Sequence, residues 1–423
     1  MKRAAIFLLV LASAATPLWA GQSQRSAEAG EDSPEAAYIT LEQLTRVVLN
    51  HNHLLRSAQF SVEGARAGVR TAAALGNPKV ELQQGQWQPS GLNRQSVRGW
   101  TVAQPIENPF IRSARIDSAE WGLKVSGQQL AMTRNDLAAQ VRTRAYEALL
   151  HQAETEMAAE TLVLLQQIRD RIQVRVETGE APRYELIKAD AEVIHARERQ
   201  QSSNLQSQQA WLDIHRLAAG QLPQRWRLVA GFYDDVELPD VSQLQAQAEL
   251  NNPELISLKH ELERAQAQLR LAQAGRWPGV ELRYGEHQEP NVRQSVWGVV
   301  VQVPLLDQRK GPVAEAQAEV DRIRARLEGR SHELQQQIVL GWRSLDMARL
   351  RVEALGQGVV REAEAALRVA QAAYRFGERG ILDVLDAQRV LRGVRSDLLQ
   401  ARYQLHTARI ALDHLAGRYA HAS

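Results

Sequence analysis

A long internal repeat constrains the fold of this chain more than any other feature of its sequence. Residues 52–82 align without a gap on residues 252–282, and 13 of these 31 positions are identical, beginning with Asn52 and Asn252. Much further along, Gly179 corresponds to Gly377. A solenoid repeat is only about 20–50 residues long. The sequence therefore predicts a duplicated half-molecule with internal pseudo-symmetry.

The first 20 residues have the pattern of a secretory signal peptide. Lys2 and Arg3 precede the apolar run 4–15, and the small residue Ala20 suits cleavage. The alternative, a membrane-anchoring helix, needs roughly 18–20 apolar residues, and this run is shorter. We therefore predict that residues 1–20 are removed. Residues 21–39 are expected to form an irregular N-terminal tail.

Composition excludes several classes of function. Without the signal peptide, Lys+Arg number 51 − 2 = 49, which equals the 49 Asp+Glu. A neutral chain gives no indication of a nucleic-acid partner. The absence of cysteine excludes disulfides, thiol catalysis, Cys-ligated metal and a lipid-modified N-terminal Cys. No cofactor is expected.

Each repeat contains a short segment with β-strand alternation, which predicts β-hairpins at 79–105 and 279–304. Strands of about 9–10 residues suit a tilted transmembrane β-strand. A small soluble sheet is the alternative, but tryptophans at strand ends are typical of a membrane interface. They are Trp87, Trp100, Trp277 and Trp297. The alternating residues expected to face lipid are Val80, Leu82, Val299, Val301 and Val303.

Long helical patterns follow each hairpin, at about 112–176 and 311–376. A helix of roughly 60 residues is about 90–100 Å long, which is more than a compact domain accommodates. After each long helix the chain reverses in a turn and forms a second helix, which predicts helical hairpins at 112–219 and 311–418. Apolar residues recur every seven positions, which predicts coiled-coil packing. These residues are Val384, Leu391, Leu398, Leu405 and Leu412, and, on the partner helix, Ile338, Leu345, Val352 and Val359.

The domain organisation follows from these patterns. The first repeat is expected at 40–219 and the second at 240–418. A linker of mixed composition occupies 220–239, and residues 419–423 form a short C-terminal tail.

Signatures of catalysis and of metal binding are incomplete. His260-Glu261 and His332-Glu333 begin like the HExxH zinc motif, but Arg264 and Gln336 occupy the place of the second histidine. No GxSxG motif or Walker A lysine is present. On one helix, His51 and His53 would point in different directions. We therefore expect no catalytic residue and no metal site.

Two acidic residues stand out in the last return helix. Asp383 and Asp386 share one face of its first turn, and Glu185 occupies the equivalent place in the first repeat. Acids at a helix N-terminus are favoured by the helix dipole. Around a symmetry axis, the same acids would form rings that select cations. The residues alone leave both interpretations open.

The ordered motifs resemble those of the TolC-like outer-membrane factors over essentially the whole mature chain. The resemblance lies in the segments "NNPELISLKHELERAQAQLRLAQAGRWPGVEL", "RVETGEAPRYELIKAD" and "YRFGERGILDVLDAQRVL". The segment "VPLLDQRKGPVAEAQAE" is most similar to the cobalt–zinc–cadmium resistance type, although Leu306 replaces a phenylalanine and the first repeat lacks the usual glycine pair.

The resemblance implies a mainly α fold with a membrane β-barrel. A homotrimer would close a twelve-stranded outer-membrane barrel, continued by a periplasmic α-helical barrel. The function implied is an exit duct, served by an inner-membrane RND-type pump and a periplasmic adaptor. Heavy-metal cations are the candidate substrates. Type I secretion or drug efflux, and a periplasmic coiled-coil adaptor without a barrel, remain alternatives.

The resemblance also implies roles for residues at the periplasmic end. Tyr374, Arg379 and Glu185 correspond to a gate, and Asp383 and Asp386 correspond to rings that determine pore selectivity. The turns that contact the adaptor would contain Thr178, Gly179, Glu180, Gly377, Glu378 and Gly380.

Overall fold

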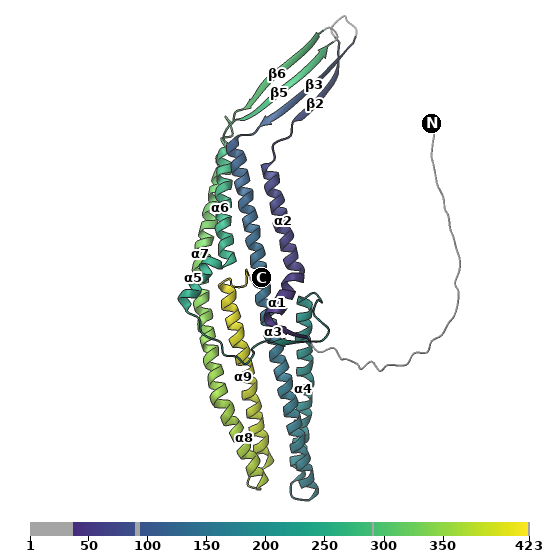
Figure 1. The fold of residues 1–423 in the computed structure, drawn as a ribbon, viewed down its shortest axis with the longest axis vertical. Coiled ribbons are helices and arrows are strands. Elements are labelled where there is room, and N and C mark those ends of the chain that lie inside the picture. The colour runs from purple at the N-terminus through teal and green to yellow at the C-terminus, as the bar shows by residue number, and fades with distance from the viewer. Residues whose placement is uncertain (1–36, 89–93, 290–291, 422–423) are drawn as a thin grey trace, which may run out of the picture.

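The structure is a computed structural model that describes residues 37–88, 94–289 and 292–421. The expected signal peptide and most of the expected N-terminal tail lie outside the described residues. The described chain is elongated, with a β-sheet at one end and long helices extending away from it (Figure 1). Among the helices described, none contains a stretch long and apolar enough to cross a membrane.

Both repeats have the same order of elements. The first consists of β1 (Ala37–Thr40), α1 (Leu41–His51), α2 (His53–Ala73), β2 (Lys79–Trp87), β3 (Gln95–Ile106), α3 (Pro109–Glu177) and α4 (Arg183–Leu217). The second consists of β4 (Trp226–Val229), α5 (Val241–Asn251), α6 (Pro253–Ala274), β5 (Gly279–Glu289), β6 (Val292–Gln302), α7 (Lys310–Ala354), a π-helical turn (Leu355–Val359), α8 (Val360–Arg375) and α9 (Ile381–Leu415).

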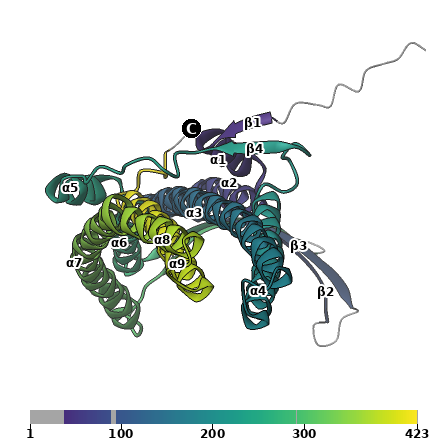
Figure 2. The same ribbon diagram turned by 90° about the horizontal axis from the view of Figure 1, so that it is seen from below.

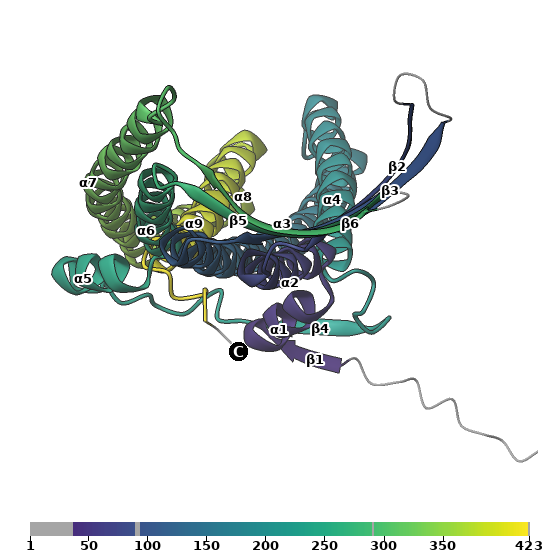
Figure 3. The same ribbon diagram turned by 90° about the horizontal axis from the view of Figure 1, so that it is seen from above.

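The helices form one curved layer. Contacts between elements give the order α2–α3–α6–α7 in the half next to the sheet, whereas in the far half α3 packs against both α4 and α9, and α9 packs against α8. Viewed along the long axis, α4 and α7 lie at opposite edges of this curve (Figures 2 and 3). The elements β1, α1, β4 and α5, which we call the girdle, lie on its convex side.

Two asparagines explain where the helices of each repeat are interrupted. Asn52 ends α1 and caps α2, since its Oδ1 accepts a hydrogen bond from the Leu54 N–H at 2.9 Å. Its Nδ2 also donates to the carbonyl of Leu217, the last residue of α4, at 3.3 Å. Asn252 repeats both roles, with its Nδ2 donating to the Leu415 carbonyl at 2.9 Å. Each asparagine therefore joins the start of a helix on the sheet side of the girdle, α2 or α6, to the end of a helix on the other side, α4 or α9.

The joint at Asn52 corrects the expectation that His51 and His53 belong to one helix. His51 and His53 consequently lie on two different helices, both exposed, rather than diverging on one. No cluster of three or more potential metal-ligating His, Cys, Asp or Glu side chains occurs among the described residues.

The sheet pairs in the antiparallel order β2–β3–β5–β6, so the two β-hairpins join through β3 and β5. Because side chains alternate along a strand, the register assigns each residue to a face. Charged residues such as Lys79, Glu81 and Arg283 share one face. The other face carries Val80, Leu82, Trp100, Val102, Ile106, Val280, Leu282, Tyr284, Trp297, Val299 and Val301. Val303, also expected on this face, lies beyond the end of β6.

The seven-residue repeat forms much of the helical core. Val384, Leu391, Leu405 and Leu412 of α9 are buried, as are Ile338 and Leu345 of α7. Val359 breaks the expected pattern because it is 44 % exposed. It lies in the π-helical turn, where the wider i→i+5 spacing rotates the following residues around the helix axis.

The girdle contains two strands that the sequence did not predict. Residues 37–39, expected in the N-terminal tail, belong to β1, and the linker contains β4. The two strands pair in parallel, from Ala37 with Trp226 to Thr40 with Val229. At only four residues each, they are too short to show a clear alternation in the sequence.

We predict that Asn252→Ala destabilises the protein more than Asn251→Ala. The first change removes the cap of α6 and the link to α9, for an expected loss of about 1–3 kcal/mol, because a lost cap costs about 1 kcal/mol and a buried hydrogen bond a similar amount. Asn251 is exposed and provides the control. Thermal unfolding of the detergent-solubilised protein measures the difference. Equal midpoints for the two variants would contradict the proposed joint.

Candidate functional site

The end of the molecule far from the sheet, which we call the tip, consists of two similar turns. Gly179 and Gly377 have positive φ angles of 79° and 75°, which favour glycine. After each, the next N–H donates to the carbonyl five residues back, Glu180 to Arg175 at 2.8 Å and Glu378 to Ala373 at 2.9 Å. This is the hydrogen bond of a Schellman motif. The same chemistry thus reverses the chain in both repeats.

Both turns are exposed. Thr178, Gly179 and Glu180 in the first turn, and Gly377, Glu378 and Gly380 in the second, all lie at the surface. Phe376, next to the second glycine, is 81 % exposed.

Tyr374 and Glu185, both expected in a gate, lie together at the tip. The Tyr374 hydroxyl and the Glu185 Oε2 are buried, and neither has a hydrogen-bond partner among the described residues. Burial raises the pKa of Tyr374, with Arg175 opposing and Glu185 adding to the shift. Tyr374 therefore remains a neutral hydroxyl donor at physiological pH.

The structure brings Arg175, rather than Arg379, to this pair. The Arg175 guanidinium lies over the Tyr374 ring, 4.8 Å from its centre, and 3.7 Å from the Glu180 carboxylate. Arg379 is exposed and forms no ion pair in the described part of the chain. Arg175 could not be singled out from the sequence, because a cation in the last turn of a helix already has an ordinary explanation.

Of the two aspartates expected in the pore, Asp383 lies in the first turn of α9 and Asp386 in the next turn, and both are exposed. Asp386 lies 3.8 Å from Arg389, on the same helix. Arg389 also forms a 2.8 Å ion pair with Glu192 of α4, and this contact connects the two helical hairpins. Asp383 forms no ion pair within the described residues, so its charge is available at the surface.

Apolar packing joins the hairpins near the tip. Leu165, Ile168 and Ile172 of α3 form one buried cluster with side chains of the other three helices. Among those side chains are Ala189, Leu367, Ile381, Val384 and Leu385.

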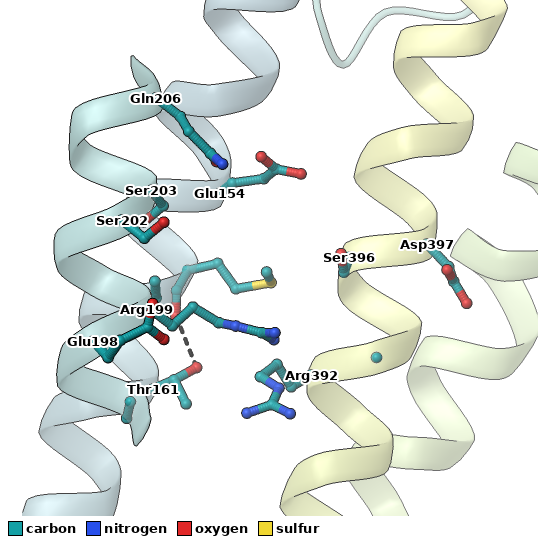
Figure 4. Close-up of a pocket in the computed structure, with 14 residues that line it drawn as sticks. Glu154, Thr161, Glu198, Arg199, Ser202, Ser203, Gln206, Arg392, Ser396 and Asp397 are labelled. Carbon is teal, nitrogen blue, oxygen red and sulfur yellow. Dashed lines mark hydrogen bonds between the residues drawn. The ribbon is translucent and has the colours of Figure 1, made fainter. Parts of the chain in front are cut away.

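Farther from the tip, a polar gap of about 510 Å³ separates α4 from α9. Arg199 of α4 and Arg392 of α9 both extend into this gap (Figure 4). Glu154, Glu198 and Asp397 also line it. Burial and the neighbouring Arg199 lower the pKa of Arg392. Two like charges oppose close approach of α4 and α9 here. Helices α3 and α9 nevertheless stay in contact beside the gap, through the Arg395–Glu160 ion pair at 3.9 Å and the buried cluster of Leu150, Ala153 and Leu399.

Comparison with known proteins assigns this architecture to a family. The family model of the outer membrane efflux proteins matches residues 44–220 and 244–418. The chain is 25 % identical to the cobalt-zinc-cadmium resistance protein CzcC of Cupriavidus metallidurans, over 90 % of this chain and 91 % of that protein. It is 24 % identical to the cation efflux system protein CusC of Escherichia coli K12, over 88 % and 85 % of the two chains.

The fold also matches solved channels. The open state of the MtrE outer membrane channel of Neisseria gonorrhoeae superimposes with a TM-score of 0.77, at 17 % identity, over 89 % of this chain and 88 % of that one. These comparisons confirm the resemblance, the fold class and the outer-membrane location expected from the sequence. The chain belongs to the outer membrane efflux protein family, and it is an efflux channel whose helices extend into the periplasm.

Proposed function

We propose that this channel is the passive exit duct of a tripartite pump for heavy-metal cations. The observation that carries the substrate class is its end-to-end similarity to CzcC, which is named for cobalt, zinc and cadmium resistance. In this proposal, an inner-membrane RND-type pump and a periplasmic adaptor deliver the cations. The duct itself performs no catalysis.

The edges of the single chain support a homotrimer. The outer strands of the sheet, β2 and β6, each have one unpaired edge in the described structure. An open sheet edge in lipid would leave backbone groups without hydrogen bonds. Three copies, contributing four strands each, would close a twelve-stranded barrel. The apolar face of the sheet would then contact lipid and the charged face would line the interior.

The helical layer has matching apolar edges. Helix α4 exposes a stripe of apolar side chains at one edge, and α7 with α8 exposes another at the opposite edge (Figure 2). Pairing of these stripes between neighbouring copies would bury both. The exposed residues are Ile187, Ile194, Leu205 and Leu212 on α4, and Leu340, Met347, Leu350 and Val369 on α7 and α8.

We propose that the tip is the gate. In the trimer, Arg379 reaches a carboxylate of the neighbouring copy, such as Glu185, and the Tyr374 hydroxyl, which has no hydrogen-bond partner among the described residues, donates to the same carboxylate. Charge-assisted hydrogen bonds of this kind contribute about 1.5–3 kcal/mol each. Three symmetric copies would keep the hairpins together until the adaptor binds.

The remaining residues of the tip have complementary roles. The exposed turns at Thr178, Gly179, Glu180, Gly377, Glu378 and Gly380 present both repeats to the adaptor. Asp383 and Asp386 would form two acidic rings around the threefold axis, which favour cations over anions.

Metal resistance tests the proposed function. Deletion of the encoding gene should lower tolerance to cobalt, zinc and cadmium, and the intact gene should restore it. Copper, nickel and a panel of amphiphilic drugs serve as comparison compounds. Sensitivity to the drugs alone would replace the proposed substrate class with small amphiphiles, whereas unchanged tolerance to every compound would contradict export of either class.

The lipid-facing side of the sheet is tested by a matched pair of arginines. Val301→Arg should impair barrel assembly by about 2–4 kcal/mol if residue 301 lies near the bilayer midplane. Val300→Arg places the same charge on the adjacent residue of the opposite face and should assemble normally. Heat-modifiable mobility of the trimer on gels measures assembly. Normal assembly of both variants would remove the support for this assignment of the faces.

Single-channel recordings in planar bilayers test the gate. Tyr374→Phe combined with Arg379→Ser should increase conductance, because hydrogen bonds that close the tip are lost. Tyr184→Phe makes the same chemical change at an exposed tyrosine of the tip and should leave conductance unchanged. Reduced trimer stability without a change in conductance would instead indicate that these residues only stabilise the fold.

A further inference from the structure

The joint of the first repeat carries a basic groove with no role in the proposed export function. The groove has a volume of about 510 Å³ and lies between the α1–α2 joint, α3 and the turn after α4. Five basic residues line it, and no acidic residue does so among the described residues. They are Arg46, His51, His53, Arg56 and Arg134.

The arginines of this groove are not paired with acidic side chains in the part of the chain that the structure describes. The nearest acidic residue on α1, Glu42, pairs with Arg142 at 3.6 Å. None of Arg46, Arg56 and Arg134 forms an ion pair with any residue that the structure describes. Like charges gathered in a concave site repel one another and attract anions.

The second repeat shows that the fold does not require this cluster. A corresponding groove of about 400 Å³ lies at the α5–α6 joint. Its described lining contains two glutamates, Glu249 and Glu328, together with Lys259 and His332, and no arginine. At an offset of 200 residues, Ala246, Asn251, Pro253 and Ile256 replace Arg46, His51, His53 and Arg56. The joint of the second repeat therefore forms without these basic side chains.

We propose that the basic groove binds oxyanion groups, carboxylate or phosphate, on the outer wall of the duct. Guanidinium groups bind both anions through paired hydrogen bonds. Helix α1 lies on the convex side of the helical layer, so the ligand would approach from the periplasm rather than from the lumen (Figure 3). Three such sites would encircle the trimer, alternating with three grooves that contain glutamates.

Calorimetric titration of the full-length protein in detergent tests the site. The probes are inorganic phosphate, citrate, polyphosphate and poly-L-glutamate, each at low and high salt. Binding of the free anions would identify a small-molecule ligand, and binding of the polymers alone would identify groups displayed on a larger molecule. Polyphosphate and poly-L-glutamate then distinguish phosphate from carboxylate.

A variant that carries the residues of the second repeat provides the sharpest comparison. Arg46→Ala with His51→Asn and Arg56→Ile should weaken binding by at least about tenfold, because charge-assisted hydrogen bonds are lost. Arg66→Gln with Arg70→Gln removes the same number of arginines from exposed positions farther along α2, and should preserve the affinity.

Two outcomes would overturn the proposal. One is equal affinity in the groove variant and the unaltered protein, and the other is the failure of all four probes to bind at low salt. Conductance and metal resistance of the groove variant should be unchanged. The anion site can therefore fail while the proposed export function stands, and the reverse also holds.

Discussion

The continuity of the curved helical layer depends on the two asparagine joints. The long helix of each repeat, α3 in the first and α7 with α8 in the second, runs past the girdle, but its partner helices stop there. Asn52 and Asn252 cap the helices on the sheet side of the girdle and hold the last carbonyls of those on the other side. Helices α2 and α4 are thereby joined end to end in the first repeat, as are α6 and α9 in the second. Without these joints, the helices that pack beside α3 and beside α7 with α8 would not be connected across the girdle.

Contacts between the two helical hairpins differ from contacts within each hairpin. Within each hairpin, buried side chains recur every seven residues over much of the helix length, and such packing is difficult to separate. Between α4 and α9, contact among the described residues is limited to the apolar cluster near the tip and the Arg389–Glu192 pair, and a polar gap follows. Helices α3 and α9 remain in contact beyond the gap, through the Arg395–Glu160 pair and the cluster of Leu150, Ala153 and Leu399. Movement of α4 away from α9 therefore breaks fewer contacts than separation of α3 from α9, which suits a hinge motion of α4.

The sequence predicted those elements whose signals repeat over many residues. The duplicated segment, the alternation of Val299 and Val301 and the seven-residue spacing from Val384 to Leu412 all correspond to features of the structure. Short or local features were missed. Strands β1 and β4 contain too few residues to show a period, and the π-helical turn at Val359 changes the phase of a pattern that remains apolar.

The tip illustrates the same limit for functional residues. Family motifs pointed to Tyr374 and Glu185, which the structure places together, yet Arg175 reaches Tyr374 from a helix far away in sequence. Nothing near Arg175 in the sequence indicates that distant partner. The interruption at Asn52 was hidden for a related reason, because asparagine is tolerated inside helices and its capping role depends on the arrival of α4.

The order of the helices has an evolutionary consequence. In the half next to the sheet, α2 and α3 of the first repeat are followed by α6 and α7 of the second in the same sense. In the proposed trimer, the seam between neighbouring copies would reproduce the seam between the two halves of one chain. Six near-equivalent units would then surround the axis. An unduplicated ancestor would have needed six identical subunits, and fusion of two allowed alternate units to diverge, as the unlike grooves of the girdle have done.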